Sequence, residues 1–256
     1  MNEMAYFEMH IYSESLGVQT TVNVIVPQQS NSGEIGVVTA VEKKQYPCLY
    51  LLHGLSDDHS IWMRRTSIER YAQKYGICVV MPFGGRSFYT DMKYGEKYYT
   101  YIAEELPRLM QEFFPVSGKR EYNYIAGLSM GGYGALKIGL RNCEKFCAVA
   151  GISSVADIEK GKERFRNALI PVFGEELVIP KEENLFTLAE EKNSHPQKPR
   201  IFMGVGTGDF LYEDNCRLRD AFQKLDYDYT YRESEGIHSW EFWDEYIQYI
   251  LEWMFQ

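Results

Sequence analysis

The sequence lacks the features that mark membrane, secreted and nucleic-acid-binding proteins. No apolar run reaches the roughly 20 residues that a membrane-spanning helix needs. The stretch from Met1 to Tyr12 has no basic segment followed by an apolar one, so no secretory signal is visible there. Acidic residues outnumber basic ones by 36 to 27, which gives a net charge of −9, and no basic patch stands out. These absences predict a protein without a membrane or nucleic-acid partner.

Cysteine is scarce, and its positions form no pairing pattern. The number is odd, and most of the thiols lie within apolar runs, at Cys48, Cys78, Cys143, Cys147 and Cys216. This pattern predicts reduced, buried thiols in a cytoplasmic protein. Cys143 and Cys147 have helical spacing, but no second pair of ligands lies near them, so no metal site is predicted.

Apolar strands alternate with helical patterns through most of the 256 residues. A hairpin over residues 5–13 and 18–26 is followed by a polar loop over 28–46. From residue 48 onward the strands are continuous apolar runs, as a parallel sheet covered by helices on both faces requires. These strands lie within 48–54, 77–82, 122–126, 146–153, 200–209 and 227–234. The composition suits one large α/β domain or two small ones.

Three segments between the strands read as helices with definable ends. The pattern over residues 67–76 predicts a helix that ends at Gly76, and a second helix is expected at about 213–224. The long pattern over 96–114 contains Pro107, so we expect a kink or a break there.

The last helix carries an apolar arc that is wider than an ordinary surface stripe. Its core face is predicted to hold Trp240, Trp243, Ile247, Ile250 and Met254, and further aromatic residues widen the arc. Burial by neighbouring elements of the same chain is the default interpretation. The alternative is a contact with a second copy, so a homo-oligomer remains open.

The segment over residues 153–197 breaks the alternation of strands and helices. It holds several charged residues around the stretch VFGEELVIPKEENLF. We interpret it either as a small lid over the strand ends or as an ordinary helix with a long loop. The pattern alone favours neither.

The stretch GLSMG places Ser129 where a strand-like run gives way to a helix-like one. Residues before it are aromatic or β-branched, and apolar residues after it recur every three or four positions. A turn this sharp strains the central residue and leaves no room for side chains at Gly127 and Gly131. The pattern therefore predicts the nucleophile elbow of an α/β-hydrolase, with an exposed serine hydroxyl.

A serine nucleophile needs a base and an acid that orients it. In this architecture the order along the chain is serine, acid, histidine, and only His195 and His238 follow Ser129. His238 lies between the last strand and the last helix, where a base would be delivered, whereas His195 lies in a polar loop.

Two acids compete for the third position. Asp209 is favoured because it follows a strand directly in a short glycine-containing loop. Asp157 is the alternative, although it could equally be an ordinary residue of a loop or of the start of a helix. Asp214 is expected to begin a helix. His53 precedes a glycine at a strand end and is interpreted as a loop-shaping residue rather than a base.

Negative charge that develops on a substrate oxygen needs two backbone N–H donors. Met130, directly after the nucleophile, should supply one, and Leu55, after the strand that ends at Gly54, should supply the other. Four tyrosines lie in predicted loops or helix starts and are candidates for lining the substrate pocket. They are Tyr89, Tyr94, Tyr98 and Tyr99, although half-buried tyrosines are also common without any such role.

Taken together, these motifs resemble a known family. The stretches HGLSDDHSIW, SFYTD, YIAEELP, AGLSMGGYGALK, GDFLYEDN and HSWEFW resemble, in order and spacing, those of esterase D-like α/β-hydrolases. The chain is most similar to bacterial tributyrin esterases, which are close to the feruloyl and acetylxylan esterases of carbohydrate esterase family 1. The resemblance covers nearly the whole chain, so it implies a single domain over residues 1–256. In feruloyl and acetyl esterases the segment before the acid strand forms a small lid, which fits 153–197.

The resemblance implies a serine carboxylesterase that needs no cofactor or metal. It implies Ser129 as nucleophile, His238 as base and Asp209 as acid, with Leu55 and Met130 as oxyanion donors. The expected substrate is a small-molecule ester with a short acyl or hydroxycinnamoyl group. A carbohydrate is one candidate for the alcohol part of this ester. An S-formylglutathione hydrolase-like thioesterase and an acyltransferase are the alternatives. S-formylglutathione hydrolases usually carry a cysteine shortly after the HGL element, and this chain has Ser56-Asp57-Asp58 there.

Overall fold

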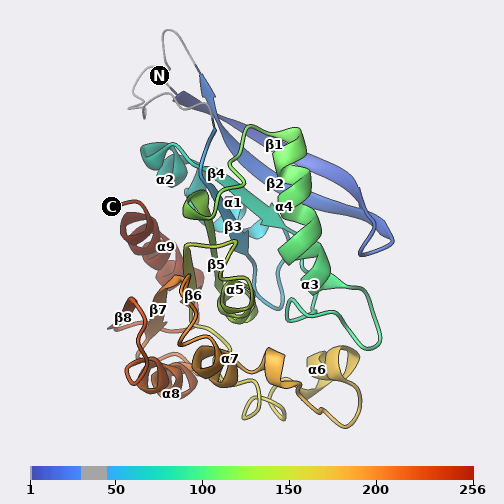
Figure 1. Ribbon diagram of the computed structural model, residues 1–256, viewed down its shortest axis with the longest axis vertical. Coiled ribbons are helices and arrows are strands. Elements are labelled where there is room, and N and C mark those ends of the chain that lie inside the picture. Colours follow the sequence, from blue (N-terminus) through green and yellow to red (C-terminus); the bar gives the residue numbers. More distant parts are fainter. Residues whose placement is uncertain (1, 30–44) are drawn as a thin grey trace.

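The computed structural model describes residues 2–29 and 45–256, and most of the loop predicted over 28–46 lies outside these ranges. The described residues form an eight-stranded sheet in the order β1-β2-β4-β3-β5-β6-β7-β8 (Figure 1). Its strands are β1 (Asn2–Ser13), β2 (Val18–Gln29), β3 (Cys48–Leu52), β4 (Cys78–Pro82), β5 (Asn123–Leu128), β6 (Ala148–Ile152), β7 (Arg200–Gly206) and β8 (Tyr229–Ser234).

The direction of the strands confirms the predicted architecture. β1 and β2 form an antiparallel hairpin, and β2 joins β4 in antiparallel fashion. All other neighbouring pairs, from β4 across to β8, are parallel. The hairpin strands are each three residues longer than predicted, because the register continues out to the pair Asn2 and Gln29. Continued backbone pairing therefore overrides the polar residues near the ends of both strands.

Helices cover both faces of the sheet, as expected for parallel strands that are apolar on both sides (Figure 1). One face packs against α1 (Ile61–Arg65), α2 (Ile68–Tyr75) and α9 (Trp240–Met254). The hydrophobic core on the other face includes residues of α3 (Tyr98–Thr100), α4 (Leu106–Phe113), α5 (Met130–Arg141), α6 (Arg166–Phe173), α7 (Leu185–Glu191) and α8 (Tyr212–Phe222). Leu49 and Leu51 point to the first face and Tyr50 and Leu52 to the second, which is the alternation of a strand.

Two helix ends follow the chemistry expected of glycine and proline. α2 ends with Gly76 at φ 59°, a left-handed conformation that favours glycine. The segment predicted over 96–114 is interrupted, because a π-helical turn over Tyr101–Glu105 separates α3 from α4. Pro107 lies just after this turn and has no N–H to continue the α-helical pattern. The Glu105 carboxylate accepts the hydroxyl of Ser13, which ties this turn to the hairpin.

The chain itself covers most of the apolar face of α9. Trp243, Ile247, Ile250 and Met254 are buried there, as predicted. Trp240 is an exception, because it is only half-buried, at the edge of the cavity described below. The default interpretation of this helix is therefore confirmed for most of its residues.

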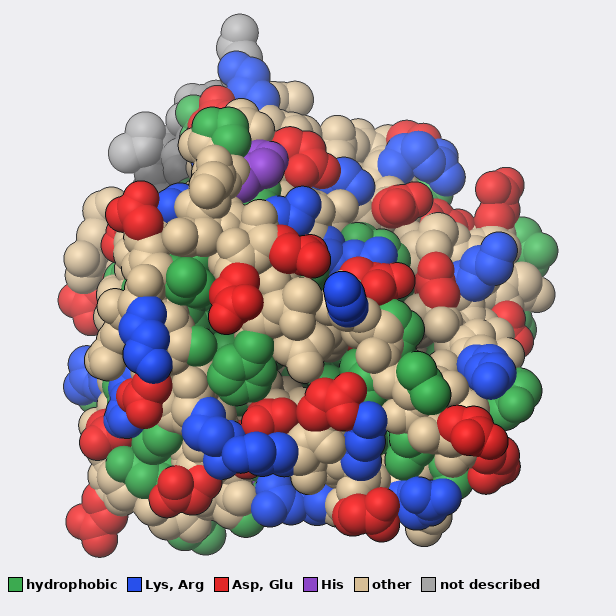
Figure 2. Space-filling view, turned by 60° about the horizontal axis from the view of Figure 1, so that its bottom comes forward, with side chains coloured by type: hydrophobic (Ala, Val, Ile, Leu, Met, Phe, Trp, Pro, Cys, Tyr) green, Lys and Arg blue, Asp and Glu red, His purple; other side chains and the backbone are tan. Residues whose placement is uncertain are grey.

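The face of the molecule in Figure 2 shows no large patch of a single charge. Acidic and basic side chains are intermingled across this face (Figure 2). None of the helices in the described ranges combines the length and the apolar content that crossing a bilayer requires. All five cysteines are free thiols, and Cys147 and Cys216 are half-buried.

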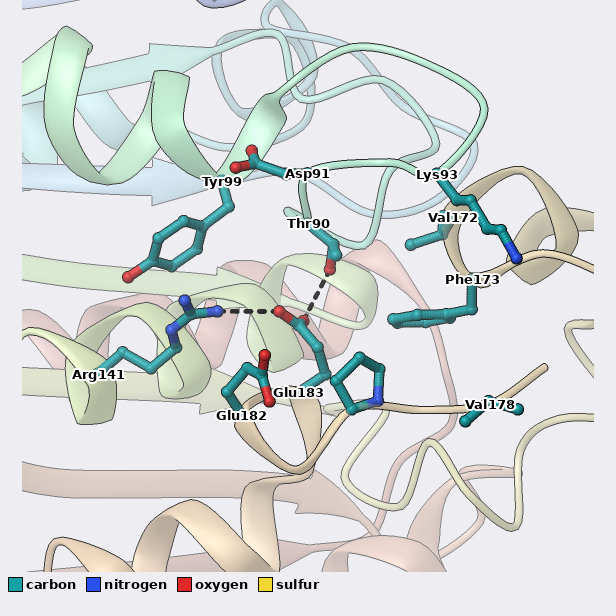
Figure 3. Close-up of a pocket in the computed structure, with 11 residues that line it drawn as sticks. Thr90, Asp91, Lys93, Tyr99, Arg141, Val172, Phe173, Val178, Glu182 and Glu183 are labelled. Carbon is teal, nitrogen blue, oxygen red and sulfur yellow. Dashed lines mark hydrogen bonds and ion pairs between the residues drawn. The ribbon is translucent and has the colours of Figure 1, made fainter.

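The segment over 153–197 leaves the sheet after β6 and returns at β7, and it contains α6, a 3-10 turn over Lys181–Glu183 and α7. Glu183 ties this segment to α5. Its carboxylate accepts Lys137 Nζ at 2.5 Å, Arg141 Nη1 at 2.9 Å and Thr90 Oγ1 at 2.9 Å. Figure 3 shows Glu183 between Arg141 and Thr90, at the wall of a cavity of about 360 Å³.

Lys137 lies entirely inside the protein, although it belongs to the helix that follows Ser129. Burial lowers the pKa of Lys137, and the Glu183 carboxylate opposes that change. The ammonium is also held by the Phe88 carbonyl at 3.0 Å and Thr90 Oγ1 at 2.6 Å. The charge of Lys137 is thus satisfied only while Glu183, from the 153–197 segment, stays in place.

Replacing Glu183 by alanine should therefore destabilise the protein strongly. The variant leaves Lys137 buried without its counter-charge, and such a loss costs about 3–5 kcal/mol. Urea denaturation at pH 7 measures the change in the free energy of unfolding. The neighbouring Glu182 is exposed, so Glu182→Ala is the matched control and should change stability by no more than about 0.5 kcal/mol. Equal losses in the two variants would contradict the role given to Glu183.

Candidate active site

Ser129 occupies a turn whose shape depends on two glycines. It joins β5 to α5 with φ 55° and ψ −117°, a conformation that a serine rarely adopts. A side chain at Gly127 would place its Cβ 2.4 Å from the backbone of Gly131. A side chain at Gly131 would place its Cβ 2.4 Å from the carbonyl oxygen of Leu52. The strained turn predicted from GLSMG is therefore present, and both glycines are sterically required.

Three predicted residues meet at the carboxyl end of the sheet. Ser129 follows β5, Asp209 follows β7, and His238 follows β8. His238 Nε2 lies 3.1 Å from Ser129 Oγ, and His238 Nδ1 lies 2.8 Å from Asp209 Oδ2. Since Asp209 is an acceptor when ionised, Nδ1–H donates to it and Nε2 is left to accept from the serine hydroxyl. This arrangement can withdraw a proton from Ser129.

The surroundings of His238 fix the orientation of its ring. The Asp209 side chain is fully buried, and its Oδ1 also accepts the N–H of Leu211 at 2.8 Å. The imidazole lies between Phe210, with ring centroids 4.5 Å apart, and Trp243, with centroids 4.8 Å apart. Because the carboxylate and both aromatic rings hold the imidazole, its Nε2 stays directed at Ser129.

The competing residues are engaged elsewhere. Asp157 forms an ion pair with Arg217 at 3.2 Å, and Asp214, in the first turn of α8, pairs with the same guanidinium at 2.5 Å. His195 is half-buried in a loop after α7, where its ring accepts a backbone N–H. Within the described chain neither acid is hydrogen-bonded to His238.

The two predicted oxyanion donors lie beside the serine. The first bond of α5 runs from the N–H of Tyr133 to the Ser129 carbonyl, so the N–H of Met130 has no partner within the helix. Leu55 lines the same cavity as Ser129, and its N–H enters no hydrogen bond among the described residues. Both amides are thus available, and their role stays a prediction.

His53 shapes the loop next to Leu55. Its Nε2 accepts the N–H of Gly84 at 2.8 Å, and its Nδ1–H donates to the Gly54 carbonyl at 2.7 Å. Burial lowers the pKa of His53 to about 4, although the hydrogen bond to Gly54 and the charge of Asp58 oppose this change. The ring is therefore neutral near pH 7, with both nitrogens engaged, which agrees with a loop-shaping residue rather than a base.

A cavity of about 590 Å³ opens over Ser129 and His238. Aromatic side chains form part of its wall, namely Phe165, Phe210, Trp240 and Trp243. Charged side chains of both signs form another part, namely Asp57, Arg65, Arg86 and Glu241. No group of three or more His, Cys, Asp or Glu side chains in the described ranges is arranged to hold a metal ion.

The four tyrosines predicted for the pocket do not line this cavity. Tyr89 is buried, and its hydroxyl donates to the His53 carbonyl at 2.9 Å. It packs on α5 at Gly134, where a Cβ would lie 2.4 Å from its ring. Tyr98 lies against Phe83, Tyr94 is largely exposed, and Tyr99 lines the cavity of Figure 3 instead.

Sequence reasoning missed the aromatic residues that do line the cavity. Phe210 directly follows Asp209, and Trp240 lies two positions after His238, so their nearness to predicted site residues was a usable signal. Phe165 belongs to the 153–197 segment, and no pattern in the sequence connects it to Ser129.

Known proteins are similar to this chain over nearly its whole length. Residues 13–254 match the model of a family described as "Putative esterase". An acetyl esterase from Caldicellulosiruptor saccharolyticus is 32% identical over 98% of both chains. Two solved structures from Staphylococcus aureus are each 31% identical over 99% of this chain. They are the serine hydrolase FphF, with a TM-score of 0.87 over 99% of that chain, and an S-formylglutathione hydrolase (FrmB), with 0.86 over 100%.

The buried neutral His53 should make stability depend on pH. The unfolded chain binds a proton at His53 below pH 6.5, whereas the folded chain does so only near pH 4. Between these values the unfolded state holds more protons, so the free energy of unfolding falls as pH falls. We expect the fall from pH 7 to pH 4 to be about 3 kcal/mol larger in the unchanged protein than in His53→Gln. Urea denaturation at pH 7, 5.5 and 4 measures it, and equal pH slopes in both proteins would refute the assignment.

Proposed function

The chain belongs to this esterase family, and on that premise we propose that it is a serine carboxylesterase that removes short acyl groups through an acyl-enzyme on Ser129. The observation that carries the proposal is the row of hydrogen bonds from Asp209 through His238 to Ser129, at 2.8 and 3.1 Å. Such a row is what a serine nucleophile needs in order to become reactive near neutral pH.

In the first step Ser129 Oγ attacks the ester carbonyl while His238 Nε2 takes its proton. Asp209 accepts the Nδ1–H bond, holds the ring in the required tautomer and stabilises the imidazolium that forms. The protonated ring then gives its proton to the leaving alcohol. Water attacks the acyl-enzyme by the same route in reverse, with His238 again as the base.

The amides of Leu55 and Met130 stabilise the negative charge on the tetrahedral oxygen. Two preorganised backbone donors of this kind contribute several kcal/mol to the transition state, because they act where water is excluded. Their supporting observations are the N–H of Met130 at the start of α5 and the N–H of Leu55 at the cavity wall, neither of which has a hydrogen-bond partner among the described residues. All steps use side chains, backbone amides and water, so the proposed mechanism needs no cofactor.

The substrate we propose is a small ester with an acetyl to butyryl group, or a hydroxycinnamoyl group. The similarity to an acetyl esterase favours the short acyl group. The aromatic wall of Phe165, Phe210 and Trp240 suits a flat or ring-shaped partner, so a hydroxycinnamoyl group and a carbohydrate-linked alcohol are both included. A lid role for residues 153–197 is part of the proposal, since Phe165 from that segment reaches the cavity.

A second candidate is the hydrolysis of S-acyl glutathione thioesters by the same three residues. It is favoured by the 31% identity to an S-formylglutathione hydrolase over nearly the whole chain. It is disfavoured by Ser56-Asp57-Asp58, which stands where such hydrolases usually carry a cysteine. The oxygen ester therefore remains our first choice.

Ser129→Ala should reduce ester turnover by several orders of magnitude, and Asp209→Asn should lower kcat by about 10⁴-fold. The asparagine removes the charge that stabilises the imidazolium and disturbs its tautomer. The measurement is hydrolysis of nitrophenyl acetate by the purified variants.

Asp157→Asn is the matched control for the acid, because Asp157 pairs with Arg217 and not with His238. It should keep most of the activity, and circular dichroism should show all three variants folded. If Asp157→Asn is inactive while Asp209→Asn is nearly normal, the acid assignment is wrong. Near-normal turnover by Ser129→Ala would reject the proposed function altogether.

The acyl and leaving-group preferences should follow the proposed substrate class. Acetyl to butyryl nitrophenyl esters should be hydrolysed faster than decanoyl or longer ones, because the cavity of about 590 Å³ is not an extended apolar surface. We also expect a higher kcat/KM for these oxygen esters than for S-formylglutathione. Methyl hydroxycinnamates complete the panel. Faster turnover of long-chain emulsions, or a clear preference for the thioester, would overturn this choice.

A further inference from the structure

A second carboxylate, that of Asp57, lies in the wall of the cavity near Ser129 and has no part in the steps above. It closes a tight turn. The N–H of Asp57 donates to the Gly54 carbonyl at 3.2 Å, and Asp57 Oδ2 accepts the N–H of Gly54 at 3.2 Å. These two bonds run in opposite directions between residues 54 and 57, so they enclose Leu55 between them.

The turn leaves Gly54 no room for a side chain. A Cβ there would lie 2.9 Å from Asp57 Oδ2, 2.9 Å from Leu128 Cδ1 and 3.7 Å from Ser129 Cβ. The carboxylate, the glycine and the serine are therefore packed within a few ångströms of one another. A small rotation of the Gly54–Leu55 peptide would therefore disturb the packing against Ser129.

The geometry of the peptide bond links this turn to the Leu55 amide. In a trans peptide the C=O of one residue and the N–H of the next point in opposite directions. The Gly54 carbonyl is held by His53 Nδ1–H at 2.7 Å and by the N–H of Asp57 at 3.2 Å. The N–H of Leu55 must consequently point away from both donors, and it is the group with no hydrogen bond of its own among the described residues.

A carboxylate beside a site that must hold negative charge is an electrostatic cost. Burial raises the pKa of Asp57 and its neighbour Asp58 adds to that effect, whereas the bond from Gly54 and the charges of Arg65 and His238 oppose it. Because its charge is unfavourable there, the Asp57 carboxylate should contribute to the site in a way that does not depend on charge. The bond to Gly54 is that contribution.

We propose that Asp57 is a positioning residue: its side chain holds the Gly54 N–H, in the peptide that precedes Gly54–Leu55, and so fixes the backbone conformation at Gly54 that makes the Leu55 N–H face the developing oxyanion. The inference rests on the proposed function, because it assigns a role at the same site. Asp57 acts through Leu55 and does not touch the reacting atoms. What it supplies is a hydrogen-bond acceptor at a fixed distance from Gly54, so an uncharged acceptor of the same shape should replace it.

The test compares Asp57→Ala with Asp57→Asn. Alanine removes the acceptor, and kcat for nitrophenyl acetate should fall by about 10- to 100-fold with KM changed less than about 3-fold, since the loss of a whole oxyanion donor costs about 10²- to 10³-fold. Asparagine keeps an oxygen at the same place, and its kcat should stay within about 3-fold of the unchanged protein. Inhibition by phenylboronic acid, whose adduct with a serine is tetrahedral, should weaken in Asp57→Ala by a factor similar to the loss in kcat.

Asp58→Ala is the matched control, because Asp58 is the neighbouring acid and its carboxylate binds Ser60 rather than Gly54. It should not show the fall in kcat. Asp57→Ser is a second truncation, to be used if alanine lowers the melting temperature. Normal kcat in a folded truncation variant, or equal losses in Asp57→Ala and Asp57→Asn, would overturn the proposal. Ser129→Ala, assayed alongside, shows separately whether the proposed function itself holds.

Discussion

The contact between the first turn of α5 and the end of β3 constrains everything around Ser129. Gly131 lies so close to the Leu52 carbonyl that no side chain fits, and Gly127 lies as close to Gly131. The chain can pass from β5 to α5 only by holding Ser129 at positive φ, a conformation that costs roughly 1–3 kcal/mol. The close packing of these two backbone segments therefore directs the Ser129 hydroxyl toward His238. The same turn begins α5, whose first N–H, that of Met130, has no hydrogen-bond partner among the described residues.

The C-terminal half of the same helix is held by charge as well as by close packing. Lys137 and Arg141 both bind Glu183, which belongs to the segment between β6 and β7. That segment also supplies Phe165 to the cavity over Ser129. One segment thus both anchors the nucleophile helix, through Glu183, and lines the cavity, through Phe165. A displacement of this segment at Glu183 would therefore disturb the ion pair with Lys137 before it changed the position of Ser129.

Patterns that are local in the sequence predicted most of the fold and the centre of the site. The spacing of Gly127, Ser129 and Gly131 specifies a turn by sterics alone, and the order of strands limits which histidine and acid can reach it. The pocket wall was not predictable in this way. Tyr89 points into α5 because Gly134 leaves a gap there, and Lys137 is buried because Glu183 meets it from 46 positions away. Such contacts depend on the path of loops, which no periodicity in the chain records.

The separation between Phe165 and Glu183 has a consequence for how such an enzyme could change its substrate. Phe165 reaches the cavity directly before α6, whereas Glu183 holds α5 from the 3-10 turn that follows α6 along the chain. A change of side chain at Phe165 would remodel the wall of the cavity over Ser129 while the ionic anchor at Glu183 persisted. The fold thereby separates the side chain that shapes the cavity from the ion pairs that keep the nucleophile helix in place.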